Sequence, residues 1–175
     1  GITHGSTAVD LSKSNMGPAD CLILGHELQA GKAGAVIVSL AIGSNQIGDE
    51  AMINLLDTLK DVSLTSLDIS KTGCGVSTAS KLAELLSADC KFTAALVEVV
   101  LDGCLLAGAT PKFGDATNYD FENIDSQMDG FVALCAVLGK VQRISLANCG
   151  LGPASAGELA KVVSNADAAG LASLK

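Results

Sequence analysis

The six cysteines are the residues best suited to nucleophilic or metal chemistry. They are Cys21, Cys74, Cys90, Cys104, Cys135 and Cys149. No two of them form a CxxC pair or join a histidine in a cluster, so a zinc site is not expected. Only His4 and His26 could act as an imidazole base, and no Ser/His/Asp or Cys/His set can be assembled from this sequence. The sequence therefore predicts no enzyme and no cofactor.

One acidic segment, 125–130, could suggest calcium. It reads Asp-Ser-Gln-Met-Asp-Gly, but it lacks the alternating Asp or Asn ligands and the distal glutamate of an EF-hand loop. No metal site is expected here. The even number of cysteines could indicate disulfides in a secreted chain, whereas helical positions for several of them favour reduced, mostly buried thiols in an intracellular protein.

Charge excludes two classes of partner. The formal net charge is −8, and Arg143 is the only arginine. A nucleic-acid surface needs clustered lysine and arginine, and an anionic membrane surface needs the same, so neither partner is expected. No apolar run approaches the roughly 20 residues of a membrane span, and no signal peptide opens the chain. These features favour a cytoplasmic protein.

The chain contains an internal repeat. Five segments share the pattern apolar-x-apolar-x-x-(Asn, Cys, Ser or Thr)-x-apolar, and each is followed by a glycine. The segments begin at Val9, Leu40, Leu67, Val99 and Ile144. The period-two spacing of the first apolar residues predicts a short strand in each segment.

A second pattern follows each glycine. Apolar or small residues recur 4, 7, 8 and 11 positions later, which places one stripe along a helix. In the second segment the stripe is Met52, Leu55, Leu56 and Leu59, and in the fifth it is Ala156, Leu159, Ala160 and Val163. Each unit is therefore a strand, a turn and a helix. Such a unit cannot bury its own apolar face, so neighbouring units must stack.

These units resemble leucine-rich repeats of the ribonuclease-inhibitor subfamily. The best matches are the segments 64–74 and 144–152, which follow the pattern Leu-x-x-Leu-x-Leu-x-x-Asn/Cys-x-Leu with a helix behind it. The resemblance covers residues 9–175 and implies an α/β solenoid. Parallel strands would line its concave face and helices its convex face, in about five repeats plus the start of a sixth. Residues 1–8 are interpreted as a leader, for which an expression scar is one explanation. The chain is interpreted as a fragment of a longer protein.

Strand residues between the apolar positions are expected to point to the concave face. We predict a mildly acidic docking surface there for a partner of basic character; a merely solvated face is the alternative. The residues concerned are Asp10, Ser12, Ser39, Ala41, Ser66, Asp68, Ser70, Glu98, Val100, Asp102, Arg143 and Ser145.

The fourth repeat carries an insertion at about 109–127. Its strand ends normally, but its helix stripe, Phe131, Leu134, Cys135 and Leu138, begins about 19 residues late. The insertion contains Phe113, Tyr119, Asp120 and Phe121. Aromatic side chains in acidic surroundings are typical of interface anchors. The alternative is a loop folded back so that its aromatic residues cover the helices.

The leading functional hypothesis is a protein-interaction module, a scaffold or receptor segment, that binds a protein through the concave face and the insertion. The resemblance also permits a GTPase-regulating domain of the Ran-activator type, and a ligand-sensing region of an innate-immune receptor. A nucleotide-dependent GTPase in a pulldown would favour the first alternative. A nucleotide-binding domain elsewhere in the parent chain would favour the second.

Overall fold

Six short strands lie side by side in one parallel sheet, in the order β1-β2-β3-β4-β7-β8. The computed structural model describes residues 7–29, 37–112, 120–164 and 170–175. The strands are β1 (Ala8–Asp10), β2 (Ser39–Ala41), β3 (Ser66–Asp68), β4 (Glu98–Val100), β7 (Arg143–Ser145) and β8 (Ser173–Leu174). The five predicted strands are confirmed, and β8 is the expected start of a sixth. β1 begins at Ala8, one residue earlier than the predicted boundary.

The register of the sheet keeps the repeat in line. The central residues of β1 to β4, of β7 and the second residue of β8 face one another in one row. They are Val9, Leu40, Leu67, Val99, Ile144 and Leu174. The first five of these side chains are buried. Because side chains alternate along a strand, their neighbours point to the opposite face of the sheet.

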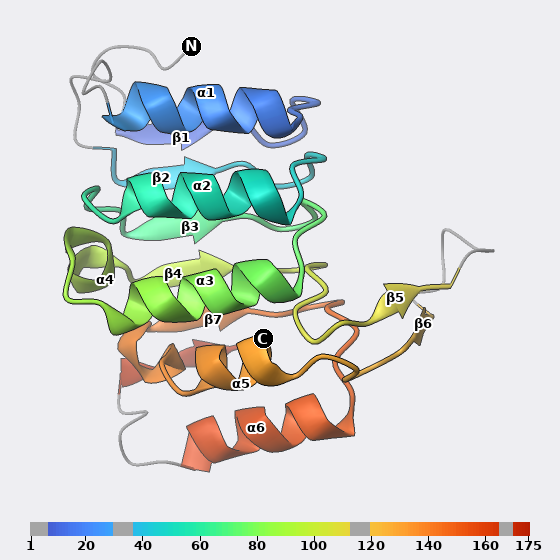
Figure 1. The fold of residues 1–175 in the computed structure, drawn as a ribbon. Coiled ribbons are helices and arrows are strands. Elements are labelled where there is room, and N and C mark those ends of the chain that lie inside the picture. The colour runs from blue at the N-terminus through green and yellow to red at the C-terminus, as the bar shows by residue number, and fades with distance from the viewer. Residues whose placement is uncertain (1–6, 30–36, 113–119, 165–169) are drawn as a thin grey trace.

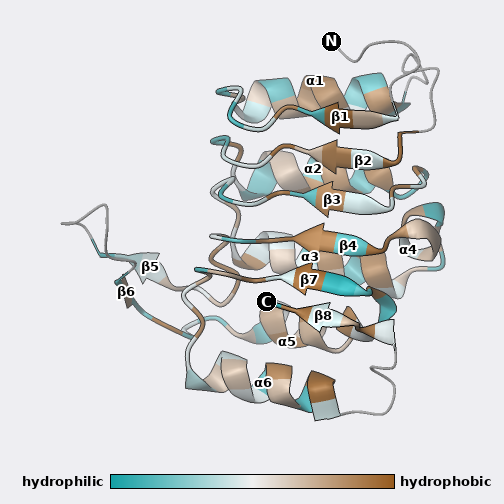
Figure 2. Cartoon of the chain, turned by 180° about the vertical axis from the view of Figure 1, so that it is seen from behind, coloured by the Kyte–Doolittle hydropathy of each residue, from teal (hydrophilic) through white to brown (hydrophobic). Residues whose placement is uncertain are grey.

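Helices cover one face of this sheet and leave the other open, as the opposite views of Figures 1 and 2 show. The long helices are α1 (Pro18–Gln29), α2 (Asp49–Leu59), α3 (Val76–Ser87), α5 (Asp129–Cys135) and α6 (Pro153–Ser164). They form a row in which α1 contacts α2, α2 contacts α3, α3 contacts α5, and α5 contacts α6. The chain is thus a mixed α/β structure with a parallel sheet.

Gly25 allows α1 and α2 to approach closely. A Cβ at this position would already lie 3.4 Å from the side chain of Thr58 and 3.7 Å from that of Leu55. Any larger side chain would have to push the two helices apart. The glycine thus belongs to the predicted apolar stripe of α1 because it fits beneath the neighbouring helix.

The predicted helix stripes are buried in four repeats but not in the fifth. All stripe residues of α2 are buried, and so are Phe131, Leu134, Cys135 and Leu138 in the fourth repeat. In α6, Ser155 is the only buried residue. Val163 is 64% exposed, so its predicted place in the core is wrong. No further helix lies beyond α6 in the described residues to cover this stripe.

Two short helices were not predicted. They are α4 (Lys91–Ala95) and the 3-10 turn η1 (Leu138–Lys140). α4 lies in the return from α3 to β4 and carries Phe92, which is fully buried. A lone aromatic residue in a connection of this length gives no periodic pattern, so this anchor was missed.

Polar side chains link the turns of the second, fourth and fifth repeats to the turn of the preceding repeat, whereas Thr72 bonds within its own repeat. The Asn45 amide donates to the carbonyl oxygen of Leu11 at 2.9 Å. The Cys104 thiol donates to the carbonyl oxygen of Ile69 at 3.3 Å. The Cys149 thiol donates to the carbonyl oxygen of Leu101 at 3.2 Å. The Asn/Cys position of the repeat pattern therefore bonds loop backbone between layers, as a buried polar group requires.

Among the residues that the structure describes, none of the helices has the length and apolar character needed to span a bilayer.

Candidate protein-binding surface

The open side of the sheet, which we call the strand face, consists of the residues predicted to point away from the core. Asp10 and Arg143 are exposed, and the others are partly exposed. These partly exposed residues are Ser12, Ser39, Ala41, Ser66, Asp68, Ser70, Glu98, Val100, Asp102 and Ser145. All twelve therefore lie where a partner could reach them. Many are small, so an incoming chain could approach the backbone of the sheet closely.

An ion pair neutralises part of the acidic charge on this face. Arg143 on β7 lies beside Glu98 on β4, with 3.4 Å between Nε and Oε1. Both side chains are well exposed, so the pair is open to solvent and contributes little to stability. A partner could displace either member at low cost. Asp10 and Asp68 carry the carboxylates that remain on β1 and β3.

Asp10 and Asp68 hold their carboxylates in the same way. In each case Oδ1 accepts a hydrogen bond of 2.9 Å from the backbone N–H two residues later, which belongs to Ser12 or Ser70. The bonds from Ser12 lower the pKa of Asp10 from its ordinary value of 3.8, although slight desolvation opposes them. Both carboxylates are therefore held in place on the strand face.

Asp102 also bonds the neighbouring repeat. Its Oδ1 accepts hydrogen bonds from the Ser145 hydroxyl at 2.6 Å and from the Ala147 N–H at 2.8 Å. Both donors belong to the next repeat. Asp102 thus ties two neighbouring repeats together, and its charge is less available to a partner than that of Asp68.

The insertion forms a two-stranded antiparallel arm, β5 (Thr110–Pro111) and β6 (Phe121–Glu122). The arm extends sideways from the body and does not cross the strand face (Figures 1 and 2). Asp120 pairs with Lys112 at 3.2 Å. Phe113 and Tyr119 lie outside the described residues. The composite site expected from the arm and the acidic strands is therefore not assembled by the described residues.

Phe121 is partly buried at the root of the arm. A Cβ on Gly150 would lie 3.1 Å from Cγ of Phe121 and 2.6 Å from Cβ of Ala109. Gly150 also has a φ of +62°, which favours glycine. The ring therefore packs against the turn of the fifth repeat. Phe121 is therefore neither an exposed interface anchor nor an aromatic residue that covers the helices.

Asp125 fixes the end of the insertion to α6. Its carboxylate accepts hydrogen bonds from the N–H groups of Gly152, Ala154 and Ser155, at 3.1, 2.8 and 3.3 Å, and from the Ser155 hydroxyl. Burial raises the pKa of this carboxyl, but these hydrogen bonds outweigh it, and the net pKa lies below the ordinary 3.8. Asp125, in the acidic segment 125–130, thus caps the N-terminus of α6.

We expect this cap to make stability fall in acid. A carboxyl whose folded pKa is lowered stabilises the fold above its unfolded pKa, near 3.8, and loses that contribution as the pH falls through the folded pKa. Between about pH 4 and pH 2, Asp125→Asn should therefore lose less stability than the wild type. Thermal melts across this range measure the difference. The exposed Asp89→Asn is the control, and an identical acid slope for Asp125→Asn and wild type would contradict the cap.

The cysteines are not placed for reactivity. All six lie in described segments as free thiols, and only Cys90 is partly exposed. Desolvation is the largest cause that raises the pKa of Cys104 and Cys135 to about 12, and that of Cys21 and Cys149 to about 11. The predicted burial of Cys104 and Cys149 is confirmed. Within the described ranges, no group of three or more His, Cys, Asp and Glu residues could hold a metal ion.

A thiol titration tests this arrangement. In denaturant without reductant we expect six reactive thiols, whereas in the native state Cys90 should react first and the five buried thiols slowly. The alternative of a disulfide-bonded chain would give fewer than six thiols in denaturant. A Cys90→Ser variant that keeps the fast native phase would assign that phase to a buried cysteine and contradict the placement.

Neither the comparison with protein-family models nor the search of curated proteins found a match for this chain. Its function must be argued from its own surfaces.

Proposed function

We propose that this chain is a leucine-rich-repeat solenoid of the ribonuclease-inhibitor type and that it acts as a protein-binding scaffold or receptor segment. The observation that carries the proposal is the strand face. Six parallel strands present one row of accessible side chains after another, while the helices cover the opposite side. Stacked repeats of this kind offer extended binding surfaces.

The repeat assignment is supported by the register and by the turns. Leu40, Leu67 and Val99 face one another without slip. Asn45 and Cys104 each bond the preceding turn from the same position of the repeat. Free, buried thiols support a cytoplasmic location for the protein.

The partner we propose is a protein with a basic surface that binds without being chemically changed. Asp68 supplies a fixed carboxylate at the centre of the strand face, and Glu98 can exchange Arg143 for a partner's cation. The arm stands beside this face and would provide a second contact. Electrostatic attraction of this kind mainly speeds association.

Photo-crosslinking tests the proposal. A photoreactive residue at Ser66, on the strand face, should capture a partner, and one at Asn54, exposed on α2, should not. In a second arm, Asp68→Lys should weaken the captured complex about tenfold, mostly through slower association, and flatten its dependence on salt. Crosslinks obtained from Asn54 alone, or unchanged kinetics in Asp68→Lys, would place the interface on the helices.

A further inference from the structure

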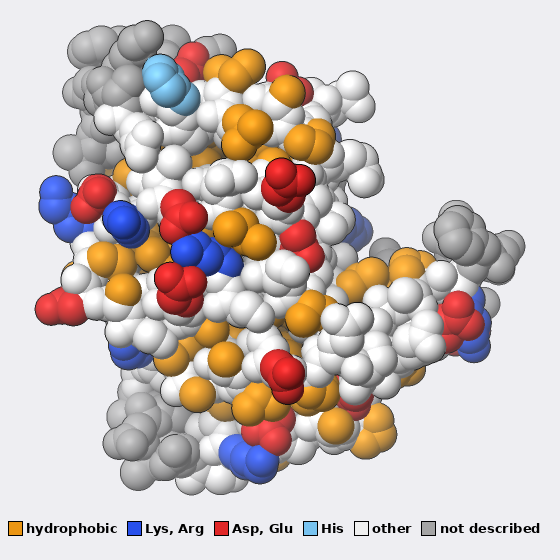
Figure 3. Space-filling model, viewed as in Figure 1, with side chains coloured by type: hydrophobic (Ala, Val, Ile, Leu, Met, Phe, Trp, Pro, Cys, Tyr) orange, Lys and Arg blue, Asp and Glu red, His pale blue; other side chains and the backbone are white. Residues whose placement is uncertain are grey.

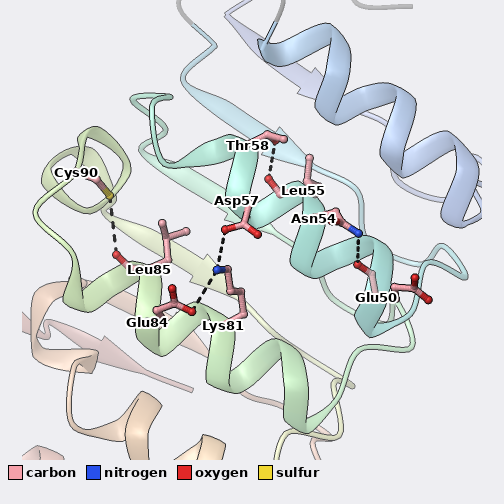
Figure 4. A network of polar contacts seen from close by, with 9 residues as sticks. All are labelled: Glu50, Asn54, Leu55, Asp57, Thr58, Lys81, Glu84, Leu85 and Cys90. Atoms are coloured by element: carbon pink, nitrogen blue, oxygen red, sulfur yellow. Dashed lines mark hydrogen bonds and ion pairs between the residues drawn. The ribbon is translucent and has the colours of Figure 1, made fainter.

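Neighbouring helices meet at fixed positions, counted from the glycine before each helix. Asp49, at position 1 of α2, accepts a hydrogen bond of 2.5 Å from the hydroxyl of Thr78, at position 3 of α3. Asp57, at position 9 of α2, pairs with Lys81, at position 6 of α3, at 2.7 Å (Figure 4). Positions 3 and 6 of a helix therefore face the helix that precedes it.

The fifth repeat uses position 3 in the same way. Ser155, at position 3 of α6, is fully buried and bonds Asp125 from the preceding insertion. Two units of the row thus present a hydroxyl at position 3 to a carboxylate of the unit before them. The helix N-terminus beside that hydroxyl also favours negative charge.

α1 carries different chemistry at these positions. Position 3 is Asp20, position 6 is Ile23, and Glu27 follows at position 10, one turn beyond Ile23 on the same side of the helix. Ile23 is 60% exposed. No helix precedes α1 in the described residues. Figure 3 shows hydrophobic side chains gathered over α1, at the end of the row.

A groove opens beside this stripe. Its walls combine apolar side chains with the two carboxylates, and the lining includes no lysine, arginine or histidine. Leu11, Met16, Ile23 and Leu24 supply the apolar lining, Asp20 and Glu27 the carboxylates, and Ser14 and Asn15 the remaining polar groups. Asp20 and Glu27 lie on α1 on either side of Ile23 in the sequence, so this lining suits an amphipathic helix with cations on both sides of an apolar residue.

We propose that the α1 groove binds a basic amphipathic helix of a separate partner protein, packed parallel to α1. The contacts between α2 and α3 define its pattern, because they pair position 1 with 3 and position 9 with 6. The incoming helix should carry Lys or Arg in its first turn, opposite Asp20. An apolar residue eight positions later should cover Ile23, and a second Lys or Arg four positions after that should meet Glu27.

A second copy of this chain does not fit the pattern. Its α6 would have to serve as the incoming helix, with Pro153 at position 1 and Lys161 at position 9. The proline offers no cation to Asp20, and the ammonium group of Lys161 would stand opposite Ile23. A second copy of this chain is therefore not the proposed occupant, and this end-on site is separate from the strand face.

Binding of a designed peptide tests the groove. The probe is a labelled peptide of about 18 residues, capped at both ends, with lysine, leucine and lysine at positions 1, 9 and 13 of a helical apolar stripe. Fluorescence anisotropy should show saturable binding that weakens with salt, and NMR shifts should map to residues 11–27. Ile23→Lys should raise the Kd at least about tenfold.

Charge exchange and matched variants make the test specific. Glu27→Lys should weaken binding, and a peptide with Glu in place of the second Lys should restore it. Val163→Lys, at an equally exposed apolar position on α6, and Asp68→Lys, on the strand face, should leave the Kd unchanged. The proposal is overturned if the peptide shows no saturable binding, if a scrambled peptide binds equally well, or if Ile23→Lys has no effect on the Kd. It is also overturned if the chain associates with itself and Ile23→Lys abolishes this self-association.

Discussion

Replacing Asn45 with leucine should lower the free energy of unfolding by about 3 kcal/mol or more. The side chain is 2% exposed and hydrogen-bonds four backbone groups, three of them at 2.9 Å or less. Its amide oxygen accepts from the Met16 N–H at 2.9 Å, and its amide nitrogen donates to the carbonyls of Leu11 and Ile42 at 2.9 and 2.7 Å. Leucine has nearly the same size but leaves these groups without a partner, at about 1–3 kcal/mol each.

Two variants separate the hydrogen bonds from other effects. Asn54→Leu makes the same exchange at an exposed position of α2 and should change stability by less than about 0.5 kcal/mol. Asn45→Cys should lose less than Asn45→Leu, because Cys104 and Cys149 already serve this position in their own repeats. Urea unfolding measures all three. Equal losses for leucine and cysteine would show that the lost bonds are not the cause.

Replacing Leu67 with alanine should lower the free energy of unfolding by about 2–5 kcal/mol. Leu67 is fully buried at the centre of β3, between Leu40 and Val99 in the row of the sheet. The core between one layer of strands and one layer of helices is thin. The neighbours of Leu67 are themselves held in register, so they cannot collapse into the cavity.

Ser70→Ala is the matched control for Leu67→Ala. Ser70 is three residues along the chain but lies on the strand face, where it is partly exposed. Its loss should change stability by less than about 0.5 kcal/mol. If thermal melts showed that Ser70→Ala is less stable than Leu67→Ala, the assignment of these residues to the outward and inward faces of the sheet would be wrong.

The strand positions could be predicted because each repeat enforces the same burial pattern. Leu40 and Leu67 are spaced along the chain as the repeat requires, and the parallel register then aligns them. The stripe of α6 shows where this reasoning stops. The spacing identifies which side of α6 is apolar, but burial of Val163 also needs another layer, and a period carries no information about whether that layer exists.

The site was harder to predict than the fold because charge alone does not say whom a carboxylate serves. Asp68, Asp102 and Asp125 look alike in the sequence. In the structure Asp68 stays on the strand face, Asp102 bonds the next repeat, and Asp125 caps α6. These partners lie up to 45 residues away along the chain, so only the stacked repeats bring them together.

The strands β4 and β7 remain in register although the chain between them carries the whole arm. Val99 faces Ile144 just as Leu67 faces Val99. The sheet therefore tolerates extra length in this turn at the cost of loop closure, which grows by only about 0.6 kcal/mol for each doubling of the loop. With Phe121 and Asp125 retained as its anchors, the connection between β5 and β6 is a natural graft position, where a foreign recognition loop could follow Lys112 and leave the paired strands β4 and β7 intact.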